Sequence, residues 1–127
     1  MAYEAGEFFP GARVQRVTAS ADIAKGAVVT IAPDAASTAA ACAEDGAGPF
    51  AVAIEAVANG KTGRVVTKGE VAVDCSGNCY TGAVVTGSGG KVKACIADPS
   101  GNYVKPLGRM TVGGANGTVG VVDLGGF

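Results

Sequence analysis

The sequence predicts an all-β protein: a small Gly-rich β-barrel or β-sandwich of residues 13–127, preceded by an extended N-terminal arm of residues 1–12. Short runs of Val, Ile and Thr recur at intervals of roughly 8 to 12 residues, and most follow a turn that contains Gly. The 127 residues include 21 Gly and no Trp, so the core must consist of small aliphatic side chains. This length corresponds to a single domain with one modest core.

The stretch ASADIAKGAVVTIAP, residues 19–33, is the first clear turn and strand. Gly26 can take a positive φ without steric cost, and the β-branched side chains that follow it suit a pleated strand. Residues 34–48 are Ala-rich and end at a Gly, so a helix is an alternative there. They lack a wide apolar stripe, which favours a strand followed by a long loop.

Three later stretches repeat the same pattern of turn and strand. Residues 60–74 predict two short strands joined at Lys68 and Gly69 by a tight turn or a bulge. In residues 87–98 a Gly pair precedes an alternating strand, as in a hairpin, and Asn116 with Gly117 introduces the last strand. About nine such segments predict a small barrel or sandwich.

The cysteines allow three interpretations. Cys75 and Cys79 have a spacing that zinc sites use, but Cys42 and Cys95 stand alone in the sequence, so a second ligand pair is missing. Cys75 and Cys79 are a candidate disulfide if the protein meets an oxidising medium. In the cytosol we expect reduced thiols and no metal.

Catalysis is disfavoured because the chain has no His, and its 11 carboxylates include no tight pair suited to acid–base chemistry. Gly60, Lys61 and Thr62 resemble the end of a phosphate-binding loop, but Glu55 stands where that motif needs a Gly, which favours a simple turn. Lys68 resembles the modified lysine at the hairpin tip of a lipoyl or biotinyl carrier, although its neighbours do not match those motifs. We therefore predict no enzyme activity and no cofactor.

The charge pattern disfavours nucleic acid, because the net charge is −1 and the ten Lys and Arg are scattered singly along the sequence. No apolar run approaches the roughly 18 residues that a membrane span needs, and no signal peptide opens the chain. We expect neither nucleic acid nor membrane as a partner, and synthesis in the cytosol.

The order of the motifs IAKGAVVTI, PFAVAIEAV, GKTGRVVTKGEVAV, YTGAVVTGSGGKVK, PLGRM and NGTVGVVDL resembles that of small phage capsid cement proteins, also called head decoration proteins. The resemblance runs from about residue 14 to residue 124. It assigns strand positions to Val28, Val65, Val71 and Val85. It assigns turn positions to Gly26, Gly60, Gly63, Gly69, Gly82 and Gly108. The Ala-rich insert, the CSGNC turn and the Phe-rich start depart from the family's pattern.

The resemblance implies a β-tulip-like barrel that binds the outside of an icosahedral capsid, with the major capsid protein and its own copies as partners, as a homotrimer. It implies a structural protein that stabilises the expanded shell and is located on the virion. A small β-clip or carrier-like binding module is the alternative function.

The arm carries half of the four Phe residues of the chain and ends in a Pro-Gly pair that breaks regular structure. Exposed rings at a terminus are typical of a surface that awaits a partner. We expect Tyr3, Phe8, Phe9 and Pro10 to contact a capsid subunit or a neighbouring copy by adding a strand to a sheet edge. The alternative is that the arm folds back over its own barrel.

Overall fold

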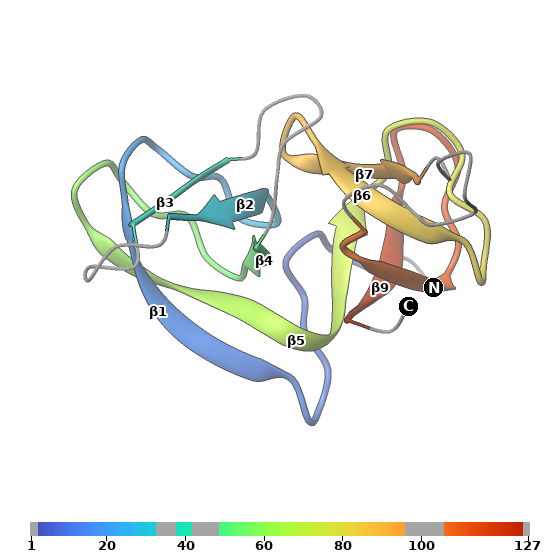
Figure 1. The fold of residues 1–127 in the computed structure, drawn as a ribbon, viewed down its shortest axis with the longest axis horizontal. Coiled ribbons are helices and arrows are strands. Elements are labelled where there is room, and N and C mark those ends of the chain that lie inside the picture. Colours follow the sequence, from blue (N-terminus) through green and yellow to red (C-terminus); the bar gives the residue numbers. More distant parts are fainter. Residues whose placement is uncertain (1–2, 33–37, 42–48, 96–105, 126–127) are drawn as a thin grey trace.

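The computed structural model describes residues 3–32, 38–41, 49–95 and 106–125, and these ranges contain strands and no helix (Figure 1). The all-β prediction is confirmed. The nine strands of these ranges are β1 (Arg13–Ala19), β2 (Val28–Ile31), β3 (Thr38–Ala41), β4 (Phe50–Ala53), β5 (Thr62–Asp74), β6 (Val84–Ser88), β7 (Lys91–Ala94), β8 (Gly108–Val112) and β9 (Val119–Leu124). In the described part of the chain, no helix is long and apolar enough to cross a membrane.

The first five strands close into a barrel with the order β1-β3-β2-β4-β5, because β1 also pairs with the first part of β5. Within residues 34–48, the segment Thr38–Ala41 forms β3, which agrees with a strand rather than a helix; the remainder lies outside the described residues. The barrel interior is filled by small aliphatic side chains, as the composition predicts: Val17, Ala19, Ile23, Val29, Ala39, Ala51, Ala53, Val57 and Val65.

Strand β5 continues without a turn for 13 residues and leaves the first barrel near its middle. Of the two alternatives predicted at Lys68 and Gly69, the tight turn is wrong and the bulge is confirmed, because the register with β1 shifts between Arg13 and Val14. Gly69 has a φ of 102°, and a Cβ there would lie 2.8 Å from the Cα of Ala12. Lys68 therefore lies within a strand, which removes the basis for the carrier interpretation.

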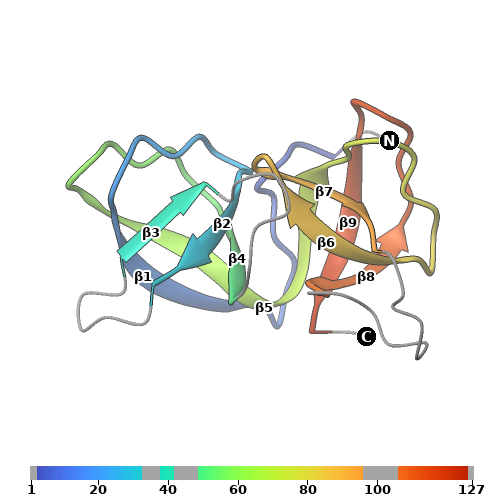
Figure 2. The same ribbon diagram turned by 45° about the horizontal axis from the view of Figure 1, so that its top comes forward.

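The second part of β5 begins another ring of strands with the order β5-β9-β8-β6-β7. A parallel bridge between Cys75, next to β5, and Val92 in β7 closes this ring. We call residues 13–68 lobe 1 and residues 69–124 lobe 2. The two lobes lie side by side and share β5, so the predicted barrel domain contains two barrels (Figure 2).

The two lobes are repeats of one unit, each 56 residues long. The sequence GAVVT occurs at 26–30 and again at 82–86, and ANG occurs at 58–60 and again at 115–117. The register in which β1 pairs with β5 is repeated where β5 pairs with β9, and beyond the bulge the equivalent residues are paired one for one. The parallel pairing of β1 with β3 recurs as the bridge between the end of β5 and β7.

Backbone hydrogen bonds repeat with the strands. The N–H of Gly26 donates to the carbonyl oxygen of Ala53 at 2.8 Å, and the N–H of Gly82 donates to that of Met110 at 2.8 Å. Side-chain oxygens also accept equivalent backbone bonds in both lobes, Asp22 from Asn59 and Asn78 from Asn116. This agreement over turns and strands indicates an internal duplication.

The lobes are joined through a row of three valines on neighbouring strands of lobe 1. Val28 pairs with Val52, and Val52 pairs with Val66. All three are fully buried and belong to the apolar cluster that fills lobe 2. Burying each side chain contributes roughly 1.5 to 3 kcal/mol, so this row holds the two lobes together.

Candidate interaction surface

The N-terminal arm adds a short strand to the outer edge of β5 in lobe 2. The N–H of Gly6 donates to the carbonyl oxygen of Ala72, and the N–H of Ala72 donates to that of Glu7, both at 2.8 Å. The N–H of Phe9 donates to the carbonyl oxygen of Glu70 at 3.2 Å. The arm thus pairs with its own chain, which agrees with the alternative that it folds back; a contact with a partner stays a prediction.

The arm also fills the junction between the lobes, where Figure 2 shows the dark blue segment passing before it enters β1. Gly6 is buried with a φ of 90°, and a Cβ there would lie 2.9 Å from Cγ of Lys25 and 3.1 Å from the carbonyl oxygen of Ala53. Lys25 also forms a salt bridge of 3.1 Å with Glu4. Because that pair is exposed, the close fit of Gly6 matters more than the charges.

The predicted aromatic residues of the arm divide into an inner pair and an outer ring. Tyr3 and Phe9 meet edge to face, with ring centroids 5.6 Å apart and an interplanar angle of 73°. Phe8 pairs with Val71 through its backbone but leaves 45% of its surface exposed, and Pro10 is exposed as well. Of the four predicted contact residues, Phe8 therefore offers an apolar surface to a partner.

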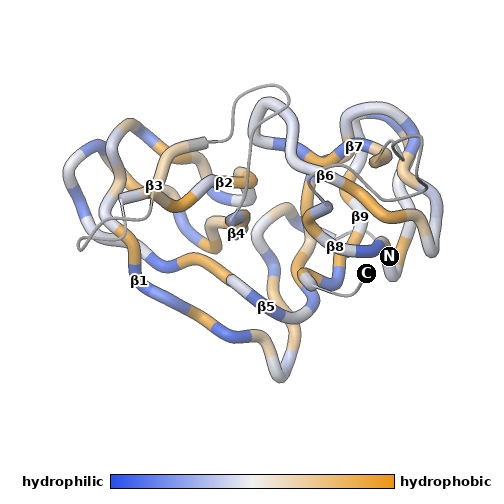
Figure 3. Tube along the Cα trace, in the orientation of Figure 1, coloured by the Kyte–Doolittle hydropathy of each residue, from blue (hydrophilic) through white to orange (hydrophobic). Residues whose placement is uncertain are grey.

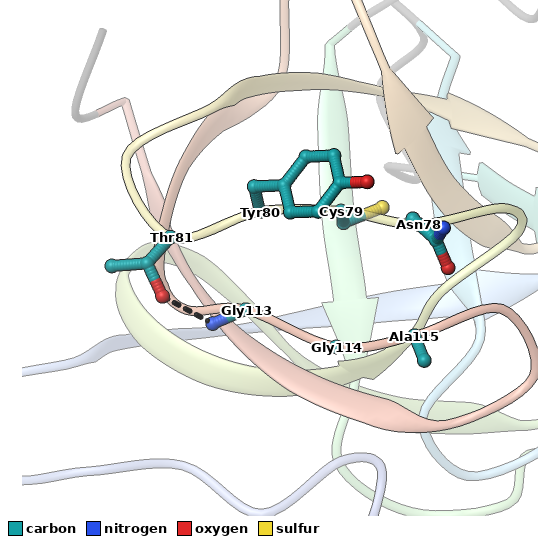
Figure 4. Close-up of a pocket in the computed structure, with 7 residues that line it drawn as sticks. All are labelled: Asn78, Cys79, Tyr80, Thr81, Gly113, Gly114 and Ala115. Carbon is teal, nitrogen blue, oxygen red and sulfur yellow. Dashed lines mark hydrogen bonds between the residues drawn. The ribbon is translucent and has the colours of Figure 1, made fainter.

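Sequence reasoning did not identify the groove beside Tyr80, an open depression of about 440 Å³ in lobe 2 (Figure 4). Residues 78–81 form one wall and residues 113–115 form the other. The hydroxyl of Thr81 accepts a hydrogen bond of 2.9 Å from the N–H of Gly113, which joins the walls. Tyr80 is 71% exposed, and the signal available in the sequence was an aromatic residue next to the turn at Gly82.

Cys75 and Cys79 are buried free thiols inside lobe 2. They take the interior positions that Ala19 and Ile23 hold in lobe 1. Burial raises the pKa of the Cys75 thiol and raises the pKa of Cys79 to about 12. These cysteines therefore fill the core as small apolar side chains, and the candidate disulfide is not formed in the structure.

The other two cysteines are far less informative. Cys42 lies outside the described residues, and Cys95 is half-buried. Among the described residues, no group of three or more His, Cys, Asp or Glu is placed to hold a metal ion.

The glycines predicted at turns serve two purposes. Three of them lie in turns, where their φ values are between 81° and 87°: Gly26, Gly60 and Gly82. The turn prediction is wrong for Gly63 and Gly108, which lie within β5 and β8. A Cβ at Gly63 would collide with the side chain of Val57, and one at Gly108 with the carbonyl oxygen of Asp123. These two positions need Gly because another residue packs directly against the backbone.

Cations that are scattered in the sequence gather on β1 and the adjoining part of β5. Arg13 lies opposite Lys68 and Arg16 lies opposite Arg64, and all four are exposed. Figure 3 shows hydrophilic and hydrophobic residues alternating along β1. The side chain of Arg64 donates a hydrogen bond of 3.4 Å to the carboxylate of Glu55, and the backbone N–H of Arg64 donates one of 2.9 Å. These bonds lower the pKa of the Glu55 carboxyl.

Comparison with known proteins finds a solved structure of the same fold. No family model matches the sequence, and no curated protein matches it. Among solved structures, the chain is similar to the N base of the head fiber protein gp8.5 of bacteriophage phi29, with a TM-score of 0.66. The two are 16% identical, and the match covers 88% of this chain and 92% of that chain. At this identity the likeness shows the fold.

Proposed function

We propose that the chain is a structural virion protein of the decoration or cement type, which binds the outer surface of an icosahedral phage capsid and stabilises the expanded shell. The observation that carries this proposal is the fold, which matches the phi29 head fiber base over nearly the full length of both chains. The motif order that resembles phage cement proteins supports the same class. The partners are the major capsid protein and further copies of this chain, assembled as a homotrimer.

The surface suits a protein that acts by contact. Large apolar side chains with at least 40% of their surface exposed are distributed over both lobes and the arm, namely Phe8, Val14, Tyr80 and Val112. Burying such side chains between a shell and a decoration protein releases roughly 25 cal/mol for each Å² of apolar surface. The bound chain stabilises the shell because it binds the assembled surface and not the free subunits.

Co-sedimentation with expanded heads that lack decoration proteins tests this function. We expect the chain to pellet with the heads and to raise their melting temperature. The variant Phe8→Ala keeps the backbone bonds of the arm, so it should melt like the parent yet bind the heads at least tenfold more weakly. The control Lys91→Ala truncates an exposed side chain of β7 that is not part of this apolar set, and it should bind normally.

Two results would count against these claims. Failure of the parent chain to pellet with the heads would contradict the proposed function. Equal binding by Phe8→Ala would contradict only the assignment of the arm to the contact surface.

A further inference from the structure

The two lobes differ in how the described residues cover the outer edge of the first strand of each lobe. In lobe 2 the outer edge of β5 pairs with the arm through Glu70 and Ala72. The equivalent positions in lobe 1 are Val14 and Arg16 on β1, and no described residue pairs with their outer edge. Among the described residues, the same strand position is therefore covered in one repeat and open in the other.

The open edge has the groups that strand pairing requires. Because β1 meets β5 in the register in which β5 meets β9, Arg16 takes the place of Ala72. It directs its backbone N–H and carbonyl oxygen away from β5, as Ala72 does toward the arm. Val14 is 40% exposed beside it. An uncovered edge of this kind is a template for another strand.

The charges around this edge indicate which strand it accepts. Arg13 faces Lys68 across the pair and Arg16 faces Arg64, an arrangement in which like charges repel one another. Glu55 forms a salt bridge with Arg64 and also interacts electrostatically with Arg16, so a single carboxylate offsets part of the charge of these four cations. The arm, which covers the equivalent edge of lobe 2, is itself an extended segment with two acidic residues. An acidic extended segment would satisfy both the backbone groups and the cations.

We propose that the outer edge of β1, from Val14 to Arg16, binds an extended acidic segment of the phage shell protein by strand addition, in the way that the arm binds β5. This inference rests on the proposed function and identifies where the shell protein is held. Backbone hydrogen bonds to Arg16 supply the pairing, and the cations of β1 and β5 select acidic side chains.

The arm of a second copy fits this edge less well than a shell segment does. The arm is held in its own chain by three backbone hydrogen bonds, and Gly6 fits closely between Lys25 and Ala53. Binding to β1 of another copy would break all of these contacts. A segment of the shell protein has no such competing site on this chain.

The test measures hydrogen exchange at single amides of the full chain, free and bound to expanded heads of the phage that encodes it. We expect the amide of Arg16 to exchange at least tenfold more slowly on the heads, while the amide of Ala72, already bonded to the arm, changes little. If the chain binds the heads and exchange at Arg16 is unchanged, the inference is wrong and the proposed function survives. If the chain does not bind, the proposed function fails, and this inference fails with it.

Two pairs of variants separate the backbone from the charge. Arg16→Pro removes the outward N–H at a strand edge, where Pro is tolerated, and Arg16→Ala keeps that donor. We expect the Pro variant to bind heads at least tenfold more weakly than the Ala variant, with circular dichroism and melting curves showing that both fold. Equal binding by two folded variants would overturn the inference.

The charge pair remains informative if the Pro variant does not fold. Arg16→Glu should weaken binding at least tenfold at low salt, and Lys91→Glu, which makes the same charge change on β7, should weaken it less. This difference should shrink at high salt because screening weakens interactions between exposed charges. Equal losses would overturn the inference, as would tight binding of duplex DNA to the cations of β1 in place of shell protein.

Discussion

The two lobes share one strand arrangement, and a row of residues that differs between them decides how they are joined. In lobe 1 the row crosses β2, β4 and β5, and in lobe 2 the equivalent row crosses β6, β8 and β9. The first row consists of Val28, Val52 and Val66, and the second of Val84, Arg109 and Asp123. The first lies against lobe 2, whereas Arg109 in the second is exposed.

This difference shows that the side chains, and not the strand pairing, make the junction. The repeated register supplies the same row twice; all three of its positions are apolar in lobe 1, where lobe 2 covers them, and two of the three are charged in lobe 2. A charged pair at the outer position keeps lobe 2 from packing on a further lobe in the same way. The two lobes therefore stack through an apolar row that belongs to lobe 1.

The largest effect on stability that we predict comes from replacing a valine of the junction row by the arginine that occupies the equivalent position in lobe 2. Val52→Arg places a charge in a fully buried position, and we expect a loss of about 4 kcal/mol or more in the free energy of unfolding. The reciprocal change Arg109→Val at the exposed position should alter stability by less than about 1 kcal/mol. Denaturant unfolding of both variants measures the difference.

Comparable losses in the two variants would show that the two rows are equivalent. The comparison between the lobes would then be wrong, because burial at the junction would not distinguish them.

Local signals in the sequence were sufficient to predict the strands and several turns. Gly26 and Gly82 precede β-branched runs, and both lie at turns with positive φ. The closure of each barrel could not be predicted, because it depends on pairing between strands far apart in the sequence. Lys68 shows the limit of such local signals. Its Gly neighbour predicted a tight turn or a bulge, and only pairing with β1 on one side and β9 on the other keeps β5 continuous.

The repeat and the candidate surfaces were partly visible in the sequence. The two copies of GAVVT and of ANG mark the repeat, but the copies differ where the lobes have different neighbours. The interior changes as well, since Ile23 and Ala53 of lobe 1 become Cys79 and Met110 in lobe 2. The fit of Gly6 at the junction could not be predicted, because it depends on residues of lobe 1 and lobe 2 that the fold brings together.

A smaller effect sharpens the comparison at the turn that begins the second strand of each lobe. Gly26 and Gly82 have φ values of 85° and 87°, so an Ala at either position costs about 1 kcal/mol in backbone strain. A Cβ at Gly26 would also lie 2.5 Å from Cβ of Ala5 in the arm, whereas nothing lies within 4 Å at Gly82. We expect Gly26→Ala to destabilise the fold by about 1 kcal/mol more than Gly82→Ala.

Melting curves of the two variants, repeated on chains that lack residues 1–10, identify the source of this difference. Without the arm the two Ala variants should lose similar amounts of stability, because the three atoms nearest to a Cβ at position 26 all belong to Ala5 of the arm. A difference that persists without the arm would place its cause within lobe 1.

The smallest effect we predict concerns pH and the interior of lobe 2. Burial raises the pKa of Cys79 from 9.0 to about 12, so the folded chain keeps this thiol protonated where the unfolded chain loses its proton. The stability that the buried neutral thiol contributes is fully present below about pH 9 and is lost progressively between pH 9 and 12. The difference in the free energy of unfolding between the parent and Cys79→Ala should therefore narrow by about 1 kcal/mol from pH 8 to pH 10.

The control is Ile23→Val at the equivalent position of lobe 1, which removes no titrating group, so its difference from the parent should stay constant. A difference for Cys79→Ala that also stays constant would mean that this thiol titrates alike in the folded and unfolded chain, and that water reaches the interior of lobe 2.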